Sequence, residues 1–214
     1  MKLSLSCRIA ELSNDKEKSF LSIEKLIKMA VINGFTGISL RPSVVSTSTP
    51  KQSVLKVKDV FNLNKMSVSM ITSNINLAKN DKYAANNLRN ITPCLDLAEQ
   101  LETSLVRIMI KHHDDIKFAK KALDEALERG VILTQQTHWG TLAETIEETL
   151  TLVKIIKRKN FGITYEPANL LACGSDYSFR GLEKLLPYVV NFYFQNIHID
   201  KNGSHEFKTL GNKN

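Results

Sequence analysis

The sequence predicts an α/β protein built as a (β/α)8 barrel, a ring of parallel strands with helices outside, that is incomplete at its C-terminal end. Short apolar segments alternate with amphipathic helical segments, which is typical of parallel strands joined by helical crossovers. Seven strand segments occur and no glycine-rich phosphate loop follows any of them, which favours a barrel over an open doubly wound sheet. The eighth strand and its helix are missing, so we expect one C-terminally shortened barrel domain over residues 1–214.

The first third of the chain supplies three of the predicted strands. Leu3 and Leu5 alternate with Ser4 and Ser6, which is typical of a half-buried strand. Asparagine and glycine then end the first helical pattern. The predicted elements are a strand over 2–9, a helix over 19–32, a strand over 36–40, a Ser- and Thr-rich loop over 44–50, a helix over 52–62 and a strand over 66–72.

The rest of the chain supplies the other four strands. Pro93 falls inside a long helical pattern over residues 81–101, where proline kinks a helix or splits it in two. Thr141 and Glu144 have the spacing of a capping box, which predicts that a helix begins there. The remaining predicted elements are strands over 104–110, 131–133, 161–165 and 189–199 and helices over 116–129 and 180–186.

Polar side chains follow two successive strands in the stretch over residues 130–171. The strand over 131–133 leads into a polar run at 135–138, and the strand over 161–165 leads into another at 166–169. The carboxyl ends of parallel barrel strands form the face on which active sites are built. We therefore expect the functional site at these two strand ends.

Size, charge and cysteine content restrict the class of protein. A chain of 214 residues with 43% hydrophobic residues can bury one sizeable core, and no apolar run approaches the ~18 residues of a membrane span. Three scattered cysteines favour a reducing, cytoplasmic compartment over a disulfide framework. The net charge of +7 comes without a basic run interleaved with aromatic residues, so we expect neither a nucleic-acid nor a membrane partner.

Several segments resemble the sugar phosphate isomerase/epimerase superfamily, whose fold is the xylose isomerase-like TIM barrel. The resemblance runs over residues 2–211 and is most specific over 130–169. Members typically show E-N-H-x-G-T after the fifth strand, where this chain has QTHWGT at 136–141. They show D-x-x-N after the sixth strand, where it has EPAN at 166–169, and H-x-K-D after the seventh, where it has YFQN at 193–196.

The resemblance implies a divalent cation, manganese or magnesium, held by two glutamates, an aspartate and a histidine, with the glutamates moving protons at carbon. Here Gln136 stands at the first glutamate, Glu166 at the aspartate and Tyr193 at the histidine, and no residue matches the last glutamate. Amides and protonated phenols are poor ligands for such cations. We therefore expect metal binding to be weak or lost, with Glu166 as the main ligand, Gln136 as a weak one and Tyr193 as a poor third.

Candidate roles follow from this resemblance and from the polar residues at strand ends. The candidate catalytic residues are Glu166, His138 and Gln136, and the candidate substrate-binding residues are Asn169, Arg8, Arg41 and Trp139. An arginine can grip a phosphate with two N–H groups, although each arginine could equally form a rim salt bridge. Arg107 falls early enough in its strand to be structural.

Each candidate also has a purely structural explanation. Glu166 could pair with a lysine at its strand end, His138 could hydrogen-bond within a loop, and Asn169 could cap a helix. The run HHDD at 112–115 fits a solvated turn with capping aspartates better than a metal site, because adjacent strand residues point to opposite faces.

Two hypotheses for the function come from different classes of protein. The first is an isomerase or epimerase that acts on a small sugar or sugar phosphate by metal-assisted proton transfer. The second is a catalytically degenerate barrel that serves as a binding or scaffold protein, which the substitutions at Gln136 and Tyr193 favour. A phosphodiesterase of the DNA-repair endonuclease type ranks last, because it needs more acidic and histidine ligands.

Two further expectations concern the C-terminal part of the chain. His198 and Asp200 share a face and could replace the ligand lost at Tyr193 only if the strand register shifts. Without an eighth strand, the strands over 2–9 and 189–199 have unpaired edges, which predicts self-association through the open barrel edges.

Overall fold

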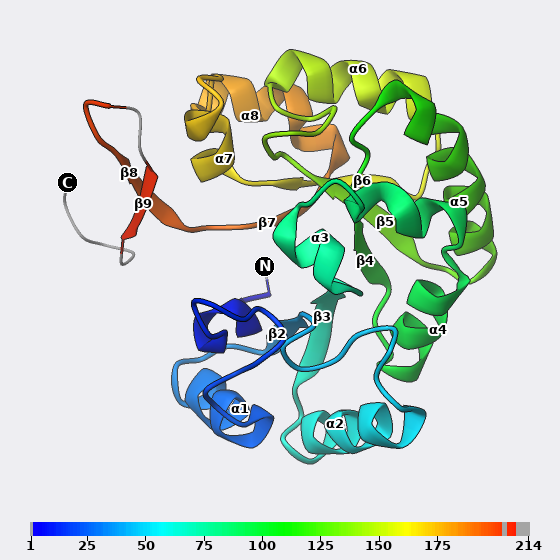
Figure 1. Cartoon of the computed structure of the whole chain (residues 1–214), viewed down its shortest axis with the longest axis vertical. Helices are drawn as coiled ribbons and strands as arrows, with labels where there is room; N and C mark the ends of the chain where they lie inside the picture. Colours follow the sequence, from blue (N-terminus) through cyan, green and yellow to red (C-terminus); the bar gives the residue numbers. More distant parts are fainter. Residues whose placement is uncertain (1, 203–204, 209–214) are drawn as a thin grey trace.

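The computed structural model describes residues 2–202 and 205–208 and contains seven parallel strands that curl into part of a barrel (Figure 1). The strands are hydrogen-bonded in their chain order, from β1 to β7. This arrangement confirms the predicted fold class. Their bounds are β1 Ser4–Ser6, β2 Gly37–Leu40, β3 Ser67–Ile71, β4 Leu105–Ile108, β5 Ile132–Gln136, β6 Phe161–Tyr165 and β7 Val189–Phe192.

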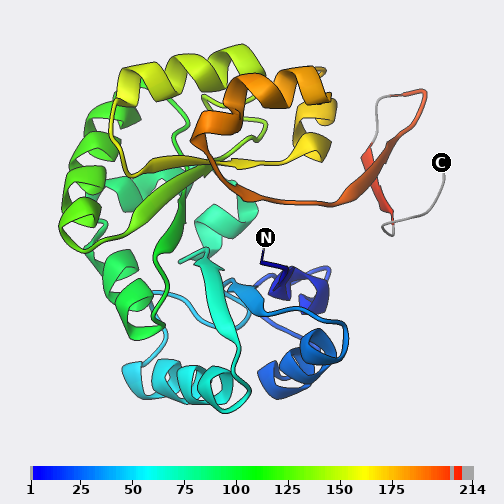
Figure 2. The ribbon, with the colours of Figure 1, turned by 180° about the vertical axis from the view of Figure 1, so that it is seen from behind.

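Most of the helices cover the convex outer side of the curled sheet, whereas the short α3 (Ile75–Lys79) lies near the barrel axis (Figures 1 and 2). Each of the first six β-strands is followed by at least one helix before the next strand begins. The helices are α1 Ile23–Ile32, α2 Lys51–Leu63, α3 Ile75–Lys79, α4 Thr92–Gln100, α5 Ile116–Glu128, α6 Ile146–Ile156, α7 Pro167–Ala172 and α8 Phe179–Leu185.

The main core lies between the sheet and these helices. Alternate strand residues such as Ile108 and Leu133 are fully buried against helical residues such as Ile27 and Leu123. Burial of each such side chain is worth about 1.5–3 kcal/mol, which fixes the register of every strand. The residues between them consequently point to the inside of the barrel, and several of these are polar.

The first predicted strand is too long. β1 ends at Ser6, whose hydroxyl accepts a hydrogen bond from the backbone N–H of Arg8 at 3.3 Å. The chain then forms a 3-10 helix over Cys7–Ala10 instead of continuing extended. Arg8 therefore leaves the strand and lies above its carboxyl end.

The capping box predicted at Thr141 and Glu144 is wrong. Helix α6 starts four residues later, at Thr145, whose hydroxyl accepts from the backbone N–H of Glu148 at 3.2 Å. The Glu148 carboxylate accepts in return from the N–H of Thr145 at 3.1 Å. Thr141 lies in the preceding loop, where its hydroxyl donates to the carbonyl of His138 at 2.7 Å.

The single long helix predicted over residues 81–101 is also wrong, although its division at Pro93 is confirmed. A 3-10 helix spans Ala84–Arg89, and α4 then begins with Pro93 in its first turn, where a missing N–H costs nothing. Helix α3 was not predicted. It is a short helix capped by Asn74, whose side chain accepts from the N–H of Leu77 at 3.0 Å.

The seventh strand is shorter than the predicted 189–199. β7 ends at Phe192, and residues 193–195 separate it from β8 Asn196–Ile199. β8 pairs antiparallel with β9 His205–Lys208, and this hairpin projects away from the curled sheet (Figure 2). His198 and Asp200 therefore lie in or beside the hairpin and do not replace a ligand at Tyr193.

Two further observations concern the described part of the chain as a whole. Its three cysteines, Cys7, Cys94 and Cys173, are all free. None of the helices within residues 2–202 is both long enough and apolar enough to span a lipid bilayer.

Candidate functional site

A cavity of about 160 Å³ lies at the carboxyl ends of the strands, on the face that the sequence predicted. It brings together every residue for which we predicted a catalytic, binding or ligand role. Those residues are Arg8, Arg41, Gln136, His138, Trp139, Glu166, Asn169 and Tyr193. The cavity is also lined by Lys16, Ala78, Lys79, Asn80, Arg107 and Gln195, for which the sequence predicted no role in binding or catalysis.

Glu166 follows β6 directly and is the only carboxylate among the described residues that line this cavity. Its side chain is 1% exposed. Oε2 accepts hydrogen bonds from the side-chain amides of Gln136 and Asn169, the second at 2.8 Å. Oε1 is buried and has no hydrogen-bond partner among the described residues. One oxygen is therefore held in place while the other is left for a ligand.

Burial raises the pKa of the Glu166 carboxyl to about 7, and the charges of Arg107, Arg8 and Arg41 oppose this rise. The nearby Gln195 side chain also lowers the pKa of this carboxyl. A carboxyl that titrates near neutral pH can both accept and return a proton in one reaction cycle. Desolvation therefore gives Glu166 the acid–base properties that an exposed glutamate lacks.

Asn169 and Thr137 hold the strand end that carries Glu166. Asn169 lies inside α7, and its Nδ2 also donates to the carbonyl of Thr137 at 2.9 Å. The Thr137 hydroxyl accepts from the N–H of Glu166 at 2.9 Å. Asn169 therefore does not cap a helix, which was the structural explanation that the sequence favoured. It positions the carboxylate.

His138 is neutral at physiological pH. Burial, and after it the charge of Arg107, lower its pKa to about 3. Its Nδ1 lies 3.0 Å from both Asn80 Nδ2 and the carbonyl of Trp139. The ring of Trp139 lies 4.1 Å from the imidazole, and 43% of this tryptophan is exposed at the rim of the cavity.

Arg107 is a cavity residue, whereas its place in the sequence suggested a structural role. It lies in β4 beside Thr134 of β5 and is 5% exposed. Its Nε has no hydrogen-bond partner among the described residues. Burial and the charge of Arg41 lower the pKa of Arg107 to about 10, so it stays charged at neutral pH. A charge inside an apolar strand was the signal that could have identified it.

The other arginines are already engaged with neighbouring side chains. Arg41 forms a buried two-pronged ion pair with Glu11, with Nε–Oε1 and Nη2–Oε2 distances of 2.5 and 3.2 Å. This is the salt bridge that the sequence left open as an alternative. Arg8 donates from Nη1 to Gln195 Oε1 at 3.1 Å. Glu11 therefore compensates the charge of Arg41, and it also acts on nearby Lys16, whose pKa it raises.

Tyr193 reaches across the inside of the barrel. Its hydroxyl lies 2.7 Å from Ser6 Oγ and 3.3 Å from Ser39 Oγ, so the side chain joins the end of β7 to β1 and β2. This position explains a tyrosine at the place where the resemblance expects a histidine. The phenol hydroxyl is hydrogen-bonded to Ser6 and Ser39 of the sheet, and no hydrogen bond links it to Glu166 among the described residues.

The described residues at this site do not fit a divalent cation. No group of three or more histidine, cysteine, aspartate or glutamate side chains within residues 2–202 and 205–208 could hold a metal ion. Glu166 is the only anionic donor of the cavity, and Arg107 and Lys16 line the same space. Manganese and magnesium need several oxygen ligands, at least some of them charged, and nearby cations repel them.

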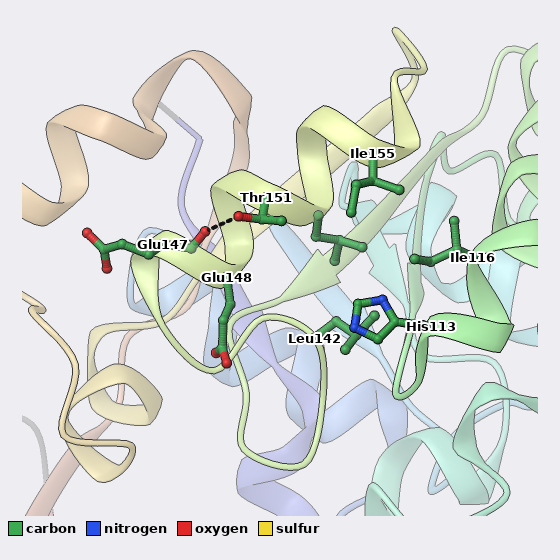
Figure 3. Close-up of a pocket in the computed structure, with 8 residues that line it drawn as sticks. His113, Ile116, Leu142, Glu147, Glu148, Thr151 and Ile155 are labelled. Atoms are coloured by element: carbon green, nitrogen blue, oxygen red, sulfur yellow. Dashed lines mark hydrogen bonds between the residues drawn. The ribbon is translucent and has the colours of Figure 1, made fainter.

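The run at residues 112–115 forms the capped turn that the sequence favoured, with residues 112–114 exposed and Asp115 buried. Asp115 accepts hydrogen bonds from the backbone N–H groups of Lys111 and His112 at 3.1 and 3.0 Å. His113 points into a separate groove of about 310 Å³ between α5 and α6, together with Ile116, Leu142 and Ile155 (Figure 3). This outer groove is mainly apolar and shares no described residue with the cavity at the strand ends.

Comparison with known proteins gives one family and a set of similar folds. The model of the family described as xylose isomerase-like TIM barrel matches residues 27–210. No curated protein sequence matches the chain significantly. The chain is similar in structure to the probable 3-DHS dehydratase AsbF from Bacillus anthracis, with 18% identity, a TM-score of 0.71 and coverage of 92% of this chain and 74% of that one.

Two other solved structures are similar in fold. A xylose isomerase-like TIM barrel protein from Mycobacterium smegmatis in complex with magnesium has 13% identity and a TM-score of 0.72, covering 96% of this chain and 79% of that one. The 3-keto-D-glucoside 4-epimerase YcjR from E. coli has 11% identity and a TM-score of 0.59, covering 90% and 78%. At these identities the similarity establishes the fold alone.

Proposed function

The chain belongs to the xylose isomerase-like TIM barrel family, and we propose that it is an isomerase of small sugars or sugar phosphates in which Glu166 transfers the proton. The observation that carries this proposal is the buried carboxylate at the end of β6. Its Oε2 is fixed by Gln136 and Asn169, and its Oε1 has no partner among the described residues. Solved structures of an epimerase and a probable dehydratase share the fold of this chain.

The reaction needs one base and a place for negative charge. Glu166 removes the proton from the carbon next to the substrate carbonyl. The C–H electron pair forms a carbon–carbon double bond, and the carbonyl π pair moves to oxygen and gives an enediolate. The charged guanidinium of Arg107, which is 5% exposed, stabilises that oxygen.

The second half of the reaction returns the proton. Protonated Glu166 gives it to the neighbouring carbon, while neutral His138 passes a proton between the two substrate oxygens. The product is the isomeric ketose or aldose, and Glu166 is again a carboxylate. No electron donor or acceptor is needed.

A single carboxylate favours isomerisation over epimerisation. Glu166 returns a proton to the same face of the planar intermediate from which it removed one. Inversion at carbon needs a second acid on the opposite face, and none of the other described residues that line the cavity is a carboxylate. The exposed ring of Trp139 at the rim offers an apolar surface to the C–H groups of a sugar.

A second function, binding without turnover, is supported by Gln136. This amide occupies the place of a catalytic glutamate in the resemblance and donates its hydrogen bond to Glu166. Such a bond stabilises the carboxylate and weakens it as a base. Binding of a sugar without exchange of its carbon-bound proton would identify this alternative.

The test is exchange of the carbon-bound proton with solvent. Purified protein is incubated in D2O with a panel of aldoses, ketoses and their phosphates, and deuterium incorporation is followed by NMR. We expect exchange with at least one small substrate and a loss of about 100-fold in Glu166→Gln, the range for removal of a general base.

Glu147→Gln is the matched control, because Glu147 is an exposed carboxylate of α6 paired with Lys184 at 3.0 Å. Its rate should equal that of the wild type. Exchange that persists in Glu166→Gln would refute the role of Glu166. Binding without exchange by any substrate would favour the second function.

A further inference from the structure

Two buried atoms of opposite kind, the Nε donor of Arg107 and the Oε1 acceptor of Glu166, line the same cavity without a hydrogen-bond partner among the described residues. Arg107 is 5% exposed and its Nε donor is unsatisfied among the described residues. Glu166 is 1% exposed, and its Oε1 acceptor also has no hydrogen-bond partner among the described residues. Buried polar groups are nearly always hydrogen-bonded in folded proteins. A ligand with both an acceptor and a donor would satisfy the two groups together.

The charges that line the cavity are predominantly positive. Among the described residues that line it, Lys16, Lys79 and Arg107 share the cavity with one carboxylate, Glu166, while Arg41 is paired with Glu11. A neutral sugar would leave this excess uncompensated. An anionic group would compensate it, and hydrogen bonds between charged partners are about twice as strong as neutral ones.

The lowered pKa values of two basic residues support this excess of positive charge in the cavity. Burial lowers the pKa of Lys16, and the charges of Arg41 and Arg8 lower it further. Arg107 shows the same combination of burial and repulsion from Arg41. These cations repel one another in the ligand-free protein, so an anion placed between them relieves the repulsion.

We infer that the cavity binds a small anionic polyol, a hydroxylated molecule bearing a phosphate or a carboxylate, and that it binds this molecule without a divalent cation. The anionic group lies against Arg107 and Lys16, and a hydroxyl donates to Oε1 of Glu166. The basic residues thus neutralise charge where a metal ion would otherwise do so. The inference rests on the proposed function for the identity of the site, but it concerns binding alone.

Titration calorimetry in the presence of EDTA is the test. The probes are D-ribose 5-phosphate, D-gluconate, inorganic phosphate and neutral D-ribose. We expect one of the two anionic polyols to bind at least about tenfold more tightly than D-ribose, with affinity that falls as salt is added. The phosphate and carboxylate probes distinguish the two sources of negative charge.

Arg107→Met should lower the affinity for the bound anion by about tenfold or more, because the buried charge is removed while the side-chain volume is kept. Arg158→Met is the matched control. Arg158 pairs with Asp124 at 2.6 Å on the surface, outside the cavity, so its loss should leave binding unchanged. A circular dichroism melt of each variant confirms that it is folded.

Three results would overturn the inference. D-ribose could bind as tightly as both anions, Arg107→Met could bind as the wild type does, or binding could require manganese and vanish in EDTA. Tight anion binding without any proton exchange would leave this inference standing and refute the proposed isomerase. Proton exchange with a neutral sugar alone would refute this inference and leave the proposed isomerase standing.

Discussion

Glu166 couples the protonation of the site to the stability of the protein. Its pKa rises from 4.5 to about 7 on folding, chiefly through burial. The folded state therefore binds more protons than the unfolded state between these values, so the stabilising contribution is complete below pH 4.5 and lost as pH rises through 7. A shift of this size corresponds to roughly 3 kcal/mol.

We expect Glu166→Gln to remove this pH dependence. Urea denaturation of the wild type should show a free energy of unfolding that falls between pH 4.5 and pH 7.5 by about 3 kcal/mol relative to the variant. Glutamine keeps the size of the side chain and does not titrate. Parallel curves for the two proteins over this range would show that Glu166 is not buried as a titrating group.

Arg107 is the residue at which stability and function oppose each other most clearly. Its charge is buried in β4 and lacks an ion-pair partner within residues 2–202 and 205–208. An apolar side chain of similar volume at this position avoids the cost of burying a charge that lacks an ion-pair partner. We expect Arg107→Met to raise the free energy of unfolding by about 1–3 kcal/mol, measured by urea denaturation at pH 7.

A lower stability for Arg107→Met would mean that the guanidinium makes favourable interactions inside the barrel. The surface variant Arg158→Met provides the comparison, because it removes an exposed pair with Asp124. Its stability should change by less than about 1 kcal/mol.

Helix α6 depends on the capping box at its first turn. Thr145 and Glu148 exchange hydrogen bonds at 3.2 and 3.1 Å, which satisfies two backbone N–H groups that the helix leaves open. We expect Thr145→Ala to lower the free energy of unfolding by about 1 kcal/mol in a thermal or urea melt.

Thr151→Ala is the control for this loss, because Thr151 lies in the middle of the same helix and bonds only the carbonyl of Glu147 at 2.9 Å. Alanine favours a helix interior, so this variant should be as stable as the wild type or slightly more so. Equal losses in both variants would mean that the capping box contributes nothing specific.

Tyr193 joins the two ends of the curled sheet. β1 pairs only with β2 and β7 only with β6 among the described strands, and the Tyr193 hydroxyl spans from the end of β7 to Ser6. We expect Tyr193→Phe to lose about 1 kcal/mol of stability in urea denaturation, the usual contribution of a hydrogen bond. Tyr188→Phe, a change at a partly exposed tyrosine, should lose less.

Within the described strands, β1 and β7 each have one unpaired edge, which predicts self-association. Phe192 and Phe194 stack at a centroid distance of 5.9 Å beside the β7 edge, and Phe194 is 64% exposed. Exposed edges with apolar side chains pair readily with another chain. Sedimentation velocity should show a mass that increases with protein concentration.

Phe194→Lys should reduce this association, because a charged side chain beside an edge opposes pairing. Phe179→Lys is the matched control, since Phe179 is 71% exposed and lies in helix α8 instead of beside a strand end. A monomer at all concentrations, or equal effects of the two lysine variants, would refute association through the edge.

The sequence alone was sufficient for the order of strands and for most of the site. Hydrophobic periodicity is a local property, and parallel strands in chain order bring their carboxyl ends to one face. Glu166, Gln136 and His138 could therefore be assigned to one place from their positions at strand ends. Asn169 and Arg41 followed from the same argument, because each comes just after a strand, and Arg8 followed because it lies near the end of the first predicted strand.

Sequence spacing could not choose between two capping boxes. Thr141 with Glu144 and Thr145 with Glu148 have the same spacing, so the local pattern is equally good for both. The hydrogen bond from Thr141 to the carbonyl of His138 keeps the first of them in the loop. Contacts between the loop and the strand end, not helix propensity, decide where α6 begins.

Only the tertiary structure decided which charges meet inside the barrel. The register of β4 against β5 places Arg107 beside Thr134 on the inside of the barrel. The sequence of one strand alone does not determine its register against the neighbouring strand. Arg8 and Gln195 meet although 187 residues separate them, as do Ser6 and Tyr193. Local sequence thus determined the helices and strands and the face on which the site lies. The curling of the strands around the barrel axis brought the positively charged side chains together in one cavity.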